Sequence, residues 1–306
     1  MRTSALWRDV RFWRFAGQAI AVLFVLSLLG FLWANLNRNL AQLGIRPSFR
    51  FLQSQAGFAI GESLIPFQSS DSYGRALLVG LLNSLLVIVT GIILATLVGV
   101  TAGIARLSNN WLVRKLALVY VEVLRNTPLL LQLFFWYFAV FLTLPKPDNP
   151  VRWLGFSFSN NGIILPGGLQ LSPEFSALLL GLSIYTATFI AEIVRGGIQS
   201  VPKGQWEAAQ SLGLKPAQRM RFVIFPQALR AIVPPLGNQY LNLAKNSSLA
   251  IAVGYPDLYA VASTTFNQTG RAVEIMVLIS LTYLSISLLI SLLLNLYNRR
   301  VQLVER

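Results

Sequence analysis

Polar side chains recur on one face of an otherwise apolar segment, where they could bind a polar solute inside a membrane. Asn238, Asn242, Lys245 and Asn246 follow the spacing i, i+4, i+7 and i+8, which places them on one side of a helix. A charge at the centre of a membrane helix costs about 2.5–3.5 kcal/mol on the insertion scale, and no acidic residue lies within a helical turn of Lys245. The spacing therefore predicts that this face lines a wet path.

Two other apolar segments carry polar faces of their own. One holds Tyr185, Thr188, Glu192 and Arg195, and the other holds Glu122, Arg125, Asn126 and Gln132. A pocket for a zwitterion needs a cation for the anionic group and an anion or carbonyl oxygens for the cationic group, roles that Lys245 and Glu192 could fill. In the alternative interpretation, Glu192–Arg195 and Glu122–Arg125 are i, i+3 pairs that only neutralise each other near a membrane surface.

The composition indicates an integral membrane protein. Of the 306 residues, 55% are hydrophobic and 12% are charged, whereas soluble domains carry about 25% charged residues. The chain contains no Cys and no His, so it has no disulfide, no thiolate metal site and neither the commonest metal ligand nor the usual general base. These absences argue against an intramembrane enzyme.

Six apolar segments are long enough to cross a bilayer, which predicts an all-α membrane bundle of about six helices. They are 16–34, 77–101, 128–144, 175–194, 231–253 and 272–296. The first is interpreted as an uncleaved span, since no cleavage site follows it. In the second, Gly99 and Gly103 have the spacing of a small-residue helix contact.

The third span must be broken. The apolar stretch 116–144 would be about 43 Å long as one helix, which exceeds a hydrocarbon core of about 30 Å. Thr127 can cap a helix and Pro128 can start one, so we expect 116–125 to bend near a membrane surface. The Pro- and Gly-rich stretch 145–173 is expected to be a loop, and Pro234 and Pro235 are expected near the start of the fifth span.

The distribution of Lys and Arg predicts the orientation. If both termini face the cytoplasm, the inner segments hold 16 of these residues and the outer segments hold 7. This asymmetry is the one that the positive-inside rule describes. The net charge of +14 is thus explained by the membrane, without nucleic acid.

The stretch 201–226 is a basic, polar island between two spans and is predicted to form two short helices. Pro202 and Pro216 suit first helical turns, Gly213 suits a left-handed residue after a helix, and Pro226 limits the second helix. The apolar side chains of this stretch are Trp206, Ala209, Leu212 and Leu214. They form a knob too small for a domain, suited to a groove on another protein. The alternative is an ordinary cytoplasmic loop.

This stretch resembles the EAA loop of ABC-importer permeases. Glu207-Ala208-Ala209, then Gly213, then Val223-Ile224-Phe225-Pro226 have the spacing of that motif, with Val223 and Phe225 in place of Ile and Leu. In that family the loop is the coupling helix, which docks on the ATPase subunit. The resemblance implies that the coupling residues here are Trp206, Glu207, Ala208, Ala209, Leu212, Gly213 and Leu214.

The resemblance extends over nearly the whole chain. The segments 121–132, 185–197 and 245–250 are similar to signatures of polar amino-acid permeases. Ala56-Gly57-Phe58 and the closing Leu303-Val304-Glu305-Arg306 resemble its general L-amino-acid branch, which takes up glutamate, glutamine, aspartate, asparagine and other polar amino acids. Longer members of that branch carry an extra membrane-spanning insertion where this chain has only 145–173.

The family implies a multi-subunit importer in a bacterial inner membrane. Two permease subunits, often different in sequence, form the path, two ATPase subunits dock below them, and a periplasmic binding protein delivers the substrate. This chain has no Walker A motif, so we expect ATP and Mg²⁺ to bind the partner ATPase and this chain to be no enzyme. A channel or a structural subunit without an ATPase is the remaining alternative.

Within the chain we expect one permease domain. Residues 1–76 would add an N-terminal span and an outer loop, and 77–296 would form the core, with the coupling loop at 197–228. The substrate-path candidates are Glu192, Lys245, Asn242, Asn238, Asn246, Tyr185, Thr188 and Gln132.

Overall fold

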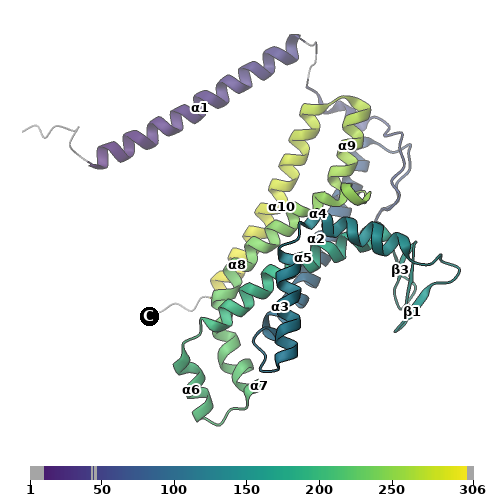
Figure 1. The fold of residues 1–306 in the computed structure, drawn as a ribbon. Coiled ribbons are helices and arrows are strands. Elements are labelled where there is room, and N and C mark those ends of the chain that lie inside the picture. Colours follow the sequence, from purple (N-terminus) through teal and green to yellow (C-terminus); the bar gives the residue numbers. More distant parts are fainter. Residues whose placement is uncertain (1–9, 43, 45–46, 302–306) are drawn as a thin grey trace, which may run out of the picture. The chain divides into compact units, whose positions relative to one another are not determined.

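The computed structural model describes residues 10–42, 44 and 47–301, and contacts divide the chain into two units, Met1–Phe49 and Arg50–Arg306 (Figure 1). The first unit carries helix α1 (Val10–Gln42). Most of its described apolar side chains are exposed, as expected for a helix surrounded by lipid, while Leu40 is buried. The prediction that used Leu303–Arg306 falls outside the described residues.

The second unit is a helical bundle with one small sheet. Its elements are η2 (Phe49–Gln53, which begins at the unit boundary), α2 (Tyr73–Ala105), α3 (Trp111–Arg125), α4 (Leu129–Phe134), η3 (Phe135–Val140), η4 (Phe141–Thr143), α5 (Pro173–Gln199), α6 (Lys203–Ser211), α7 (Pro216–Arg219), η5 (Met220–Ile224), α8 (Phe225–Asn246), η6 (Ser247–Val253), α9 (Leu258–Thr269) and α10 (Ala272–Val301). Segments η3 and η5 are π-helical, and η2, η4 and η6 are 3-10 turns.

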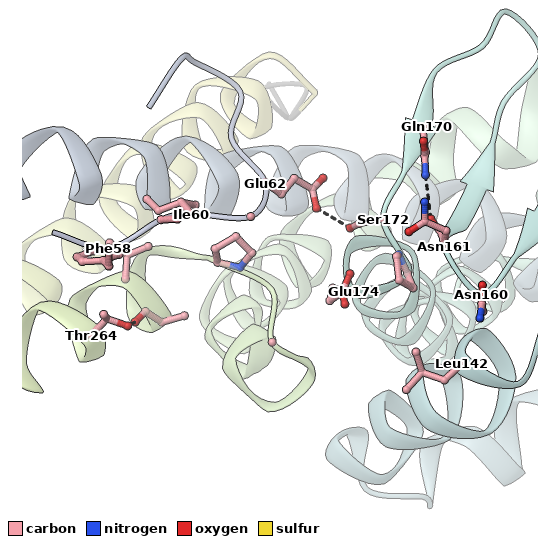
Figure 2. Close-up of a pocket in the computed structure, with 17 residues that line it drawn as sticks. Phe58, Ile60, Glu62, Leu142, Asn160, Asn161, Gln170, Ser172, Glu174 and Thr264 are labelled. Carbon is pink, nitrogen blue, oxygen red and sulfur yellow. Dashed lines mark hydrogen bonds between the residues drawn. The ribbon is translucent and has the colours of Figure 1, made fainter. Parts of the chain in front are cut away.

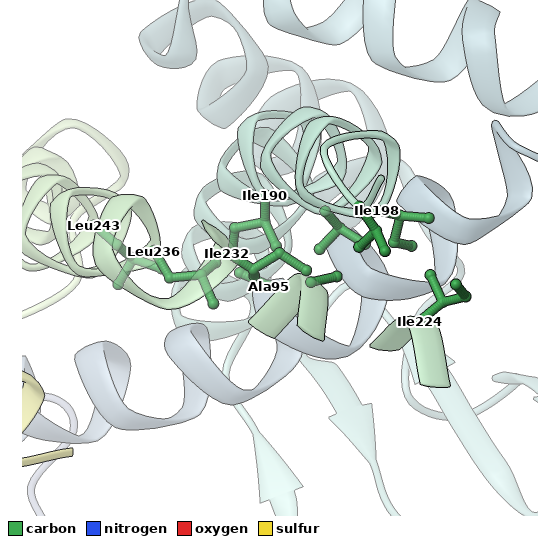
Figure 3. Close-up of a cluster of buried hydrophobic side chains, with 10 residues drawn as sticks. Ala95, Ile190, Ile198, Ile224, Ile232, Leu236 and Leu243 are labelled. Carbon is green, nitrogen blue, oxygen red and sulfur yellow. The ribbon is translucent and has the colours of Figure 1, made fainter. Parts of the chain in front are cut away.

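Helices α2, α5 and α8 form the core of the bundle. A Cβ atom on Gly99 would lie 2.6 Å from Ile190, and one on Gly103 would lie 2.7 Å from the Ala191 carbonyl oxygen, so α2 and α5 pack with their backbones close together. This confirms the predicted small-residue contact. Figure 3 shows the buried cluster that joins the three helices, with Ile232 of α8 next to Ile190 of α5 and Leu243 at the far end of the cluster.

The expected break in the third span is present. The axes of Trp111–Arg125 and Leu129–Thr143 differ by 106°. The Gln132 side chain donates hydrogen bonds to the carbonyl oxygens of Leu124 (2.8 Å) and Thr127 (3.0 Å), which satisfies backbone groups freed by the bend. Thr127 does not cap the next helix as we expected, because its hydroxyl donates back to the Val123 carbonyl oxygen instead.

Four described helices are long and apolar enough to cross a membrane, namely α1, α2, α5 and α10, and the bent pair can supply a fifth. Helix α8 has 22 residues and is therefore about 33 Å long, but its polar face lowers its hydropathy. It begins at Phe225, earlier than the expected 231, so Pro234 and Pro235 lie inside it. The span count is consistent with a permease bundle of about six helices.

Pro226 does not separate the two expected elements. The chain stays helical from α7 through η5 into α8, and Pro226 lies in the first turn of α8. A proline has no N–H to give to the preceding helical turn, and the wider π-turn at Met220–Ile224 accommodates that loss.

The stretch 145–173 is not a plain loop. It contains an antiparallel sheet of β1 (Val151–Trp153), β2 (Phe156–Ser159), β3 (Gly162–Ile164) and β4 (Gln170–Leu171) in that order. The alternation Phe156-Ser157-Phe158-Ser159 has the period of a strand, and its signal was hidden by the surrounding Pro and Gly. In the segment before α2, Phe51 and Ala56 pack with α9 and α10.

Candidate functional site

One face of α8 is polar and exposed, while the opposite face is packed into the bundle. Asn238, Asn242 and Lys245 are exposed and Asn246 is half-buried. Leu236, Leu243 and Ala244 are buried on the other side. Within the described part of the chain, no hydrogen bond or ion pair involves the side chains of Asn238, Asn242 or Lys245. This face has the amides and the cation to bind a polar solute, and it needs water, a solute or a second chain in front of it.

The other path candidates lie away from this exposed face. Thr188 is buried, and its hydroxyl donates to the carbonyl oxygen of Tyr185 at 2.7 Å. Tyr185 is half-buried and packs edge-on against Phe189, 5.1 Å between ring centres. The amide of Gln132 is occupied by the break between α3 and α4. The structure therefore does not bring all eight candidates together.

Glu192 lies in an ionic cluster. Its carboxylate contacts the guanidinium of Arg106 and accepts hydrogen bonds from Arg195 at 2.9 and 3.0 Å. Arg195 also donates to the side chain of Gln199 at 2.6 Å, at the last residue of α5. The i, i+3 pair Glu192–Arg195 is thus formed, as the alternative interpretation required. Sequence reasoning missed Arg106, because its position just after α2 gives no sign that its side chain contacts α5.

The second proposed pair is not formed. Arg125 lies over the ring of Phe189, 5.2 Å from its centre, and not on Glu122. Glu122 instead lies 4.0 Å from Arg106 and is exposed. A cation over an aromatic ring is stabilised by the negative face of that ring. The partner of Arg125 is therefore Phe189, and not Glu122 as the i, i+3 spacing suggested.

Lys245 and Glu192 are too far apart to hold one amino acid. Leu243 packs against Gly91 of α2, and Ala191 packs against Gly103. The twelve residues of helix between these glycines rise about 18 Å, so the two charged residues lie at different depths of the bundle. This arrangement favours separate roles for Lys245 and Glu192 over one pocket that uses both for a single zwitterion.

The helical hairpin of α6 and α7 lies at the end of the bundle where α5 ends and α8 begins (Figure 1). Gly213 has φ of +74°, which confirms the left-handed residue after the first helix. Backbone hydrogen bonds from Gly213 to Gln210 (2.9 Å) and from Leu214 to Ala209 (3.2 Å) close the turn. The turn needs Gly for its backbone angle alone, since no atom lies within 4 Å of a Cβ placed there.

The structure divides the seven coupling candidates into two groups. Ala209 is buried, and Trp206 packs on the core cluster with the Arg219 guanidinium 5.8 Å from its ring centre. These two side chains hold the hairpin to the bundle. Glu207, Ala208, Leu212 and Gly213 are exposed and Leu214 is half-buried. Leu212 is 78% exposed, so it is the most prominent apolar side chain of the hairpin.

Sequence reasoning missed one exposed aromatic residue beside this hairpin. Phe222, in η5, is 63% exposed and has Arg221 5.6 Å from its ring centre. An apolar residue exposed among basic ones is a typical feature of a docking surface. The signal in the sequence was its position directly before the Val223-Ile224-Phe225-Pro226 end of the motif, but periodicity alone does not show that it is exposed.

Comparison with known proteins points to one family. Residues 91–303 match the family described as the binding-protein-dependent transport system inner membrane component. The chain is 43% identical to the general L-amino acid transport system permease protein AapQ of Rhizobium johnstonii, over 93% of this chain and 92% of that protein. It is 38% identical to the glutamate/glutamine/aspartate/asparagine transport system permease protein BztB of Rhodobacter capsulatus, over 100% and 97%.

A solved structure supports the same assignment. A chain in the crystal structure of an amino acid ABC transporter with histidines is similar with a TM-score of 0.60 and 32% identity, over 74% of this chain and 95% of that one. The alignment with BztB runs over 414 positions, although this chain has 306 residues. The relative therefore contains segments that have no counterpart here.

Proposed function

We propose that this chain carries polar L-amino acids. The chain belongs to the family of binding-protein-dependent transport system inner membrane components, and it is a permease subunit of an amino-acid ABC importer. Glutamate, glutamine, aspartate and asparagine are the proposed substrates, supported by the transport system to which the relative BztB belongs. The chain is a multi-pass inner-membrane protein and not an enzyme. ATP hydrolysis belongs to a separate ATPase subunit, which we propose also binds the ATP and the Mg²⁺.

The exposed polar face of α8 is the single observation that carries the proposed path. Asn238, Asn242 and Lys245 cannot face lipid without a large desolvation cost. We assign this face to the boundary with a second permease subunit, so that the substrate passes between two chains. Lys245 binds the substrate carboxylate and the Asn side chains bind its polar groups. The remaining candidates lie away from this face and support the path from within the bundle; they are Tyr185, Thr188, Gln132 and Glu192.

The second permease is proposed to be a related chain of different sequence. Two copies of this chain facing each other through α8 would bring two Lys245 ammonium groups toward the same path, and like charges repel. A partner with a different residue at that position avoids the repulsion. The full complex then has two permeases, two ATPase subunits and a periplasmic binding protein; the family itself implies the ATPase and the binding protein.

The α6–α7 hairpin is proposed as the contact with the ATPase. Glu207, Ala208, Leu212 and Leu214 offer the docking surface, Gly213 sets the turn, and Trp206 and Ala209 fix the hairpin to the bundle. This end of the bundle is proposed to face the cytoplasm together with both termini, supported by the excess of Lys and Arg on that side. Residues 77–296 form the core permease in this proposal, and 1–76 add the N-terminal span and outer loop.

The test is reconstitution of the complete complex. The complex is co-purified in lipid nanodiscs, and its ATPase rate is measured with binding protein loaded with one amino acid at a time. We expect stimulation by binding protein loaded with glutamate, glutamine, aspartate or asparagine, and little by the empty protein. Equal rates with empty and loaded protein for every amino acid would contradict the proposal.

A further inference from the structure

A cavity of about 870 Å³ opens at the end of the bundle opposite the α6–α7 hairpin. Three parts of the chain form its walls: the segment 58–62 that precedes α2, the sheet with the start of α5, and Pro256 with the first turns of α9 (Figure 2). Its polar lining side chains are Glu62, Asn160, Asn161, Gln170, Ser172, Glu174 and Thr264. In the proposed orientation the cavity faces the outside of the cell.

The charge of this cavity is opposite to that of the chain. Glu62 and Glu174 are the charged side chains that line it, and no Lys or Arg is among its described lining residues, although the net charge of the chain is +14. The amides of Asn160, Asn161 and Gln170 form the facing wall. A site with two carboxylates and several amides is suited to a cation that also makes neutral hydrogen bonds.

Neither carboxylate has a cationic partner within the described part of the chain. The Ser172 hydroxyl donates to Glu62 at 2.5 Å, and the Tyr137 hydroxyl donates to Glu174 at 2.9 Å. Burial, together with the nearby charge of Glu174, raises the pKa of Glu62. Figure 2 shows the two carboxylates near one another, between the segment that holds Ile60 and the hairpin that holds Asn161. A cation between them would relieve this repulsion.

We propose that this cavity receives a lysine or arginine side chain of the binding protein. Glu62 and Glu174 both bind the cationic group of that side chain. The inference rests on the proposed function, because it needs a binding protein that docks on the outer end of the permease. The transported amino acid itself does not fit, since the proposed substrates carry at least one carboxylate that both Glu side chains would repel. The volume also exceeds that of one side chain, so the tip of a loop enters with the cation.

The position of Glu174 connects this docking point to the coupling hairpin. Glu174 lies in the first turn of α5, and α5 runs without interruption to Gln199, shortly before α6. At its far end α5 carries the Glu192–Arg195–Gln199 contacts. A cation bound at Glu174 therefore acts on one end of a helix whose other end positions the ATPase contact.

The experiment measures ATPase rate against the concentration of loaded binding protein, using the complete complex in nanodiscs. The test variant is Glu62→Gln with Glu174→Gln, because the amides keep acceptors for the Ser172 and Tyr137 hydroxyls. The matched control is Asp148→Asn, which removes an exposed acid from the loop before β1 but not from the cavity. Losing a charge-assisted hydrogen bond is expected to raise the half-maximal concentration about tenfold or more.

The expected result has three parts. The double variant needs more binding protein, its maximal rate stays close to that of the wild type, and added salt weakens the apparent affinity less than in the wild type. Asp148→Asn behaves like the wild type. A double variant with an unchanged half-maximal concentration would overturn the inference while leaving the proposed function intact, because stimulation by loaded protein would persist. An equal shift in Asp148→Asn would overturn it too, since the effect would then be general surface charge.

A charge reversal provides an independent measurement. Glu174→Lys places a cation in the cavity, so loaded binding protein is expected to stimulate the ATPase at least about tenfold less at a concentration that half-saturates the wild type. Normal stimulation of the Glu174→Lys complex would overturn the inference.

Discussion

Three charged side chains of the bundle differ in the groups that surround them. This difference separates residues with a structural role from a residue with a proposed role in transport. Glu192 contacts Arg106 and Arg195 and belongs to an ionic cluster. Arg125 lies over Phe189. Lys245 is exposed and has no ion pair in the described part of the chain. Residues that already have partners stabilise the bundle, so we propose Lys245 as the charge that binds a substrate.

Lys245→Met is expected to weaken transport without changing the fold. The side chain is exposed, so its replacement leaves no cavity, and Met keeps the apolar stem. The variant loses a charge-assisted hydrogen bond of about 1.5–3 kcal/mol. We therefore expect an increase of about 10- to 150-fold in the substrate concentration that half-saturates the polar face of α8. Uptake and loaded-binding-protein-stimulated ATPase measure this, while capture by the binding protein stays unchanged.

Lys245→Arg is the matched control, because it keeps the charge, and it is expected to retain most of the activity. Removal of Glu192 is not expected to rescue Lys245→Met, since their neighbours Leu243 and Ala191 pack against glycines about 18 Å apart along α2. Full uptake by Lys245→Met would eliminate the proposed role.

Asp257 provides a prediction about pH. It is fully buried, accepts a hydrogen bond from the Ala260 N–H at 2.8 Å and from Tyr283 at 3.2 Å, and burial raises its pKa to about 6. An unfolded aspartate binds its proton only near pH 3.9. The folded state therefore takes up the proton first, and lowering the pH from about 7.5 to about 5.5 stabilises it through this group by about 1 kcal/mol.

The comparison variant is Asp257→Asn, whose amide oxygen still accepts the Ala260 N–H but does not titrate. Thermal melts of the purified complex are measured at both pH values. The stability of the wild type relative to Asp257→Asn is expected to increase as the pH falls. A relative stability that stays constant or decreases would show that Asp257 does not titrate in this range.

At the scale of elements, the α6–α7 turn depends on the backbone of Gly213. Its φ of +74° is costly for a β-branched residue, and a Cβ there would meet no atom. Gly213→Val is expected to strain the turn by about 1–2 kcal/mol, displace Leu212 and reduce uptake at normal protein levels. Gly213→Asn tests the cause, since Asn enters the left-handed region more easily and is expected to retain more uptake. Equal uptake by both variants and the wild type would contradict this account.

The sequence predicts some elements well because their signals are local. The break near Pro128 and the left-handed Gly213 follow from residue types whose backbone preferences are strong. The sheet at 151–171 was missed because its strands are two to four residues long, too short for periodicity to stand out. The candidate face on α8 follows from helical spacing, whereas the partners of Glu192 and Arg125 depend on which helices pack together.

At the scale of the whole molecule, the orientation in the membrane can be tested with single cysteines. The chain contains no native Cys, so each introduced thiol is the only target. Asn149→Cys lies in the loop before β1, and Ala217→Cys is exposed on α7. We expect a membrane-impermeant thiol reagent to label the thiol at position 149 from the outside and the thiol at position 217 only from the cytoplasm. Labelling at position 149 from the cytoplasm alone would reverse the proposed topology.

The central claim is that the polar face of α8 lines the transport path between two permease subunits. The most direct measurement is the rate at which a water-soluble thiol reagent labels Asn242→Cys in the reconstituted complex, with Leu288→Cys on α10 as the control that faces lipid. Leu288 is 61% exposed in this chain. We predict that the Asn242→Cys thiol reacts and that loaded binding protein with ATP changes its rate, while the Leu288→Cys thiol stays unreactive because thiols in lipid do not ionise. An Asn242→Cys thiol as unreactive as the control thiol in every state would contradict the account.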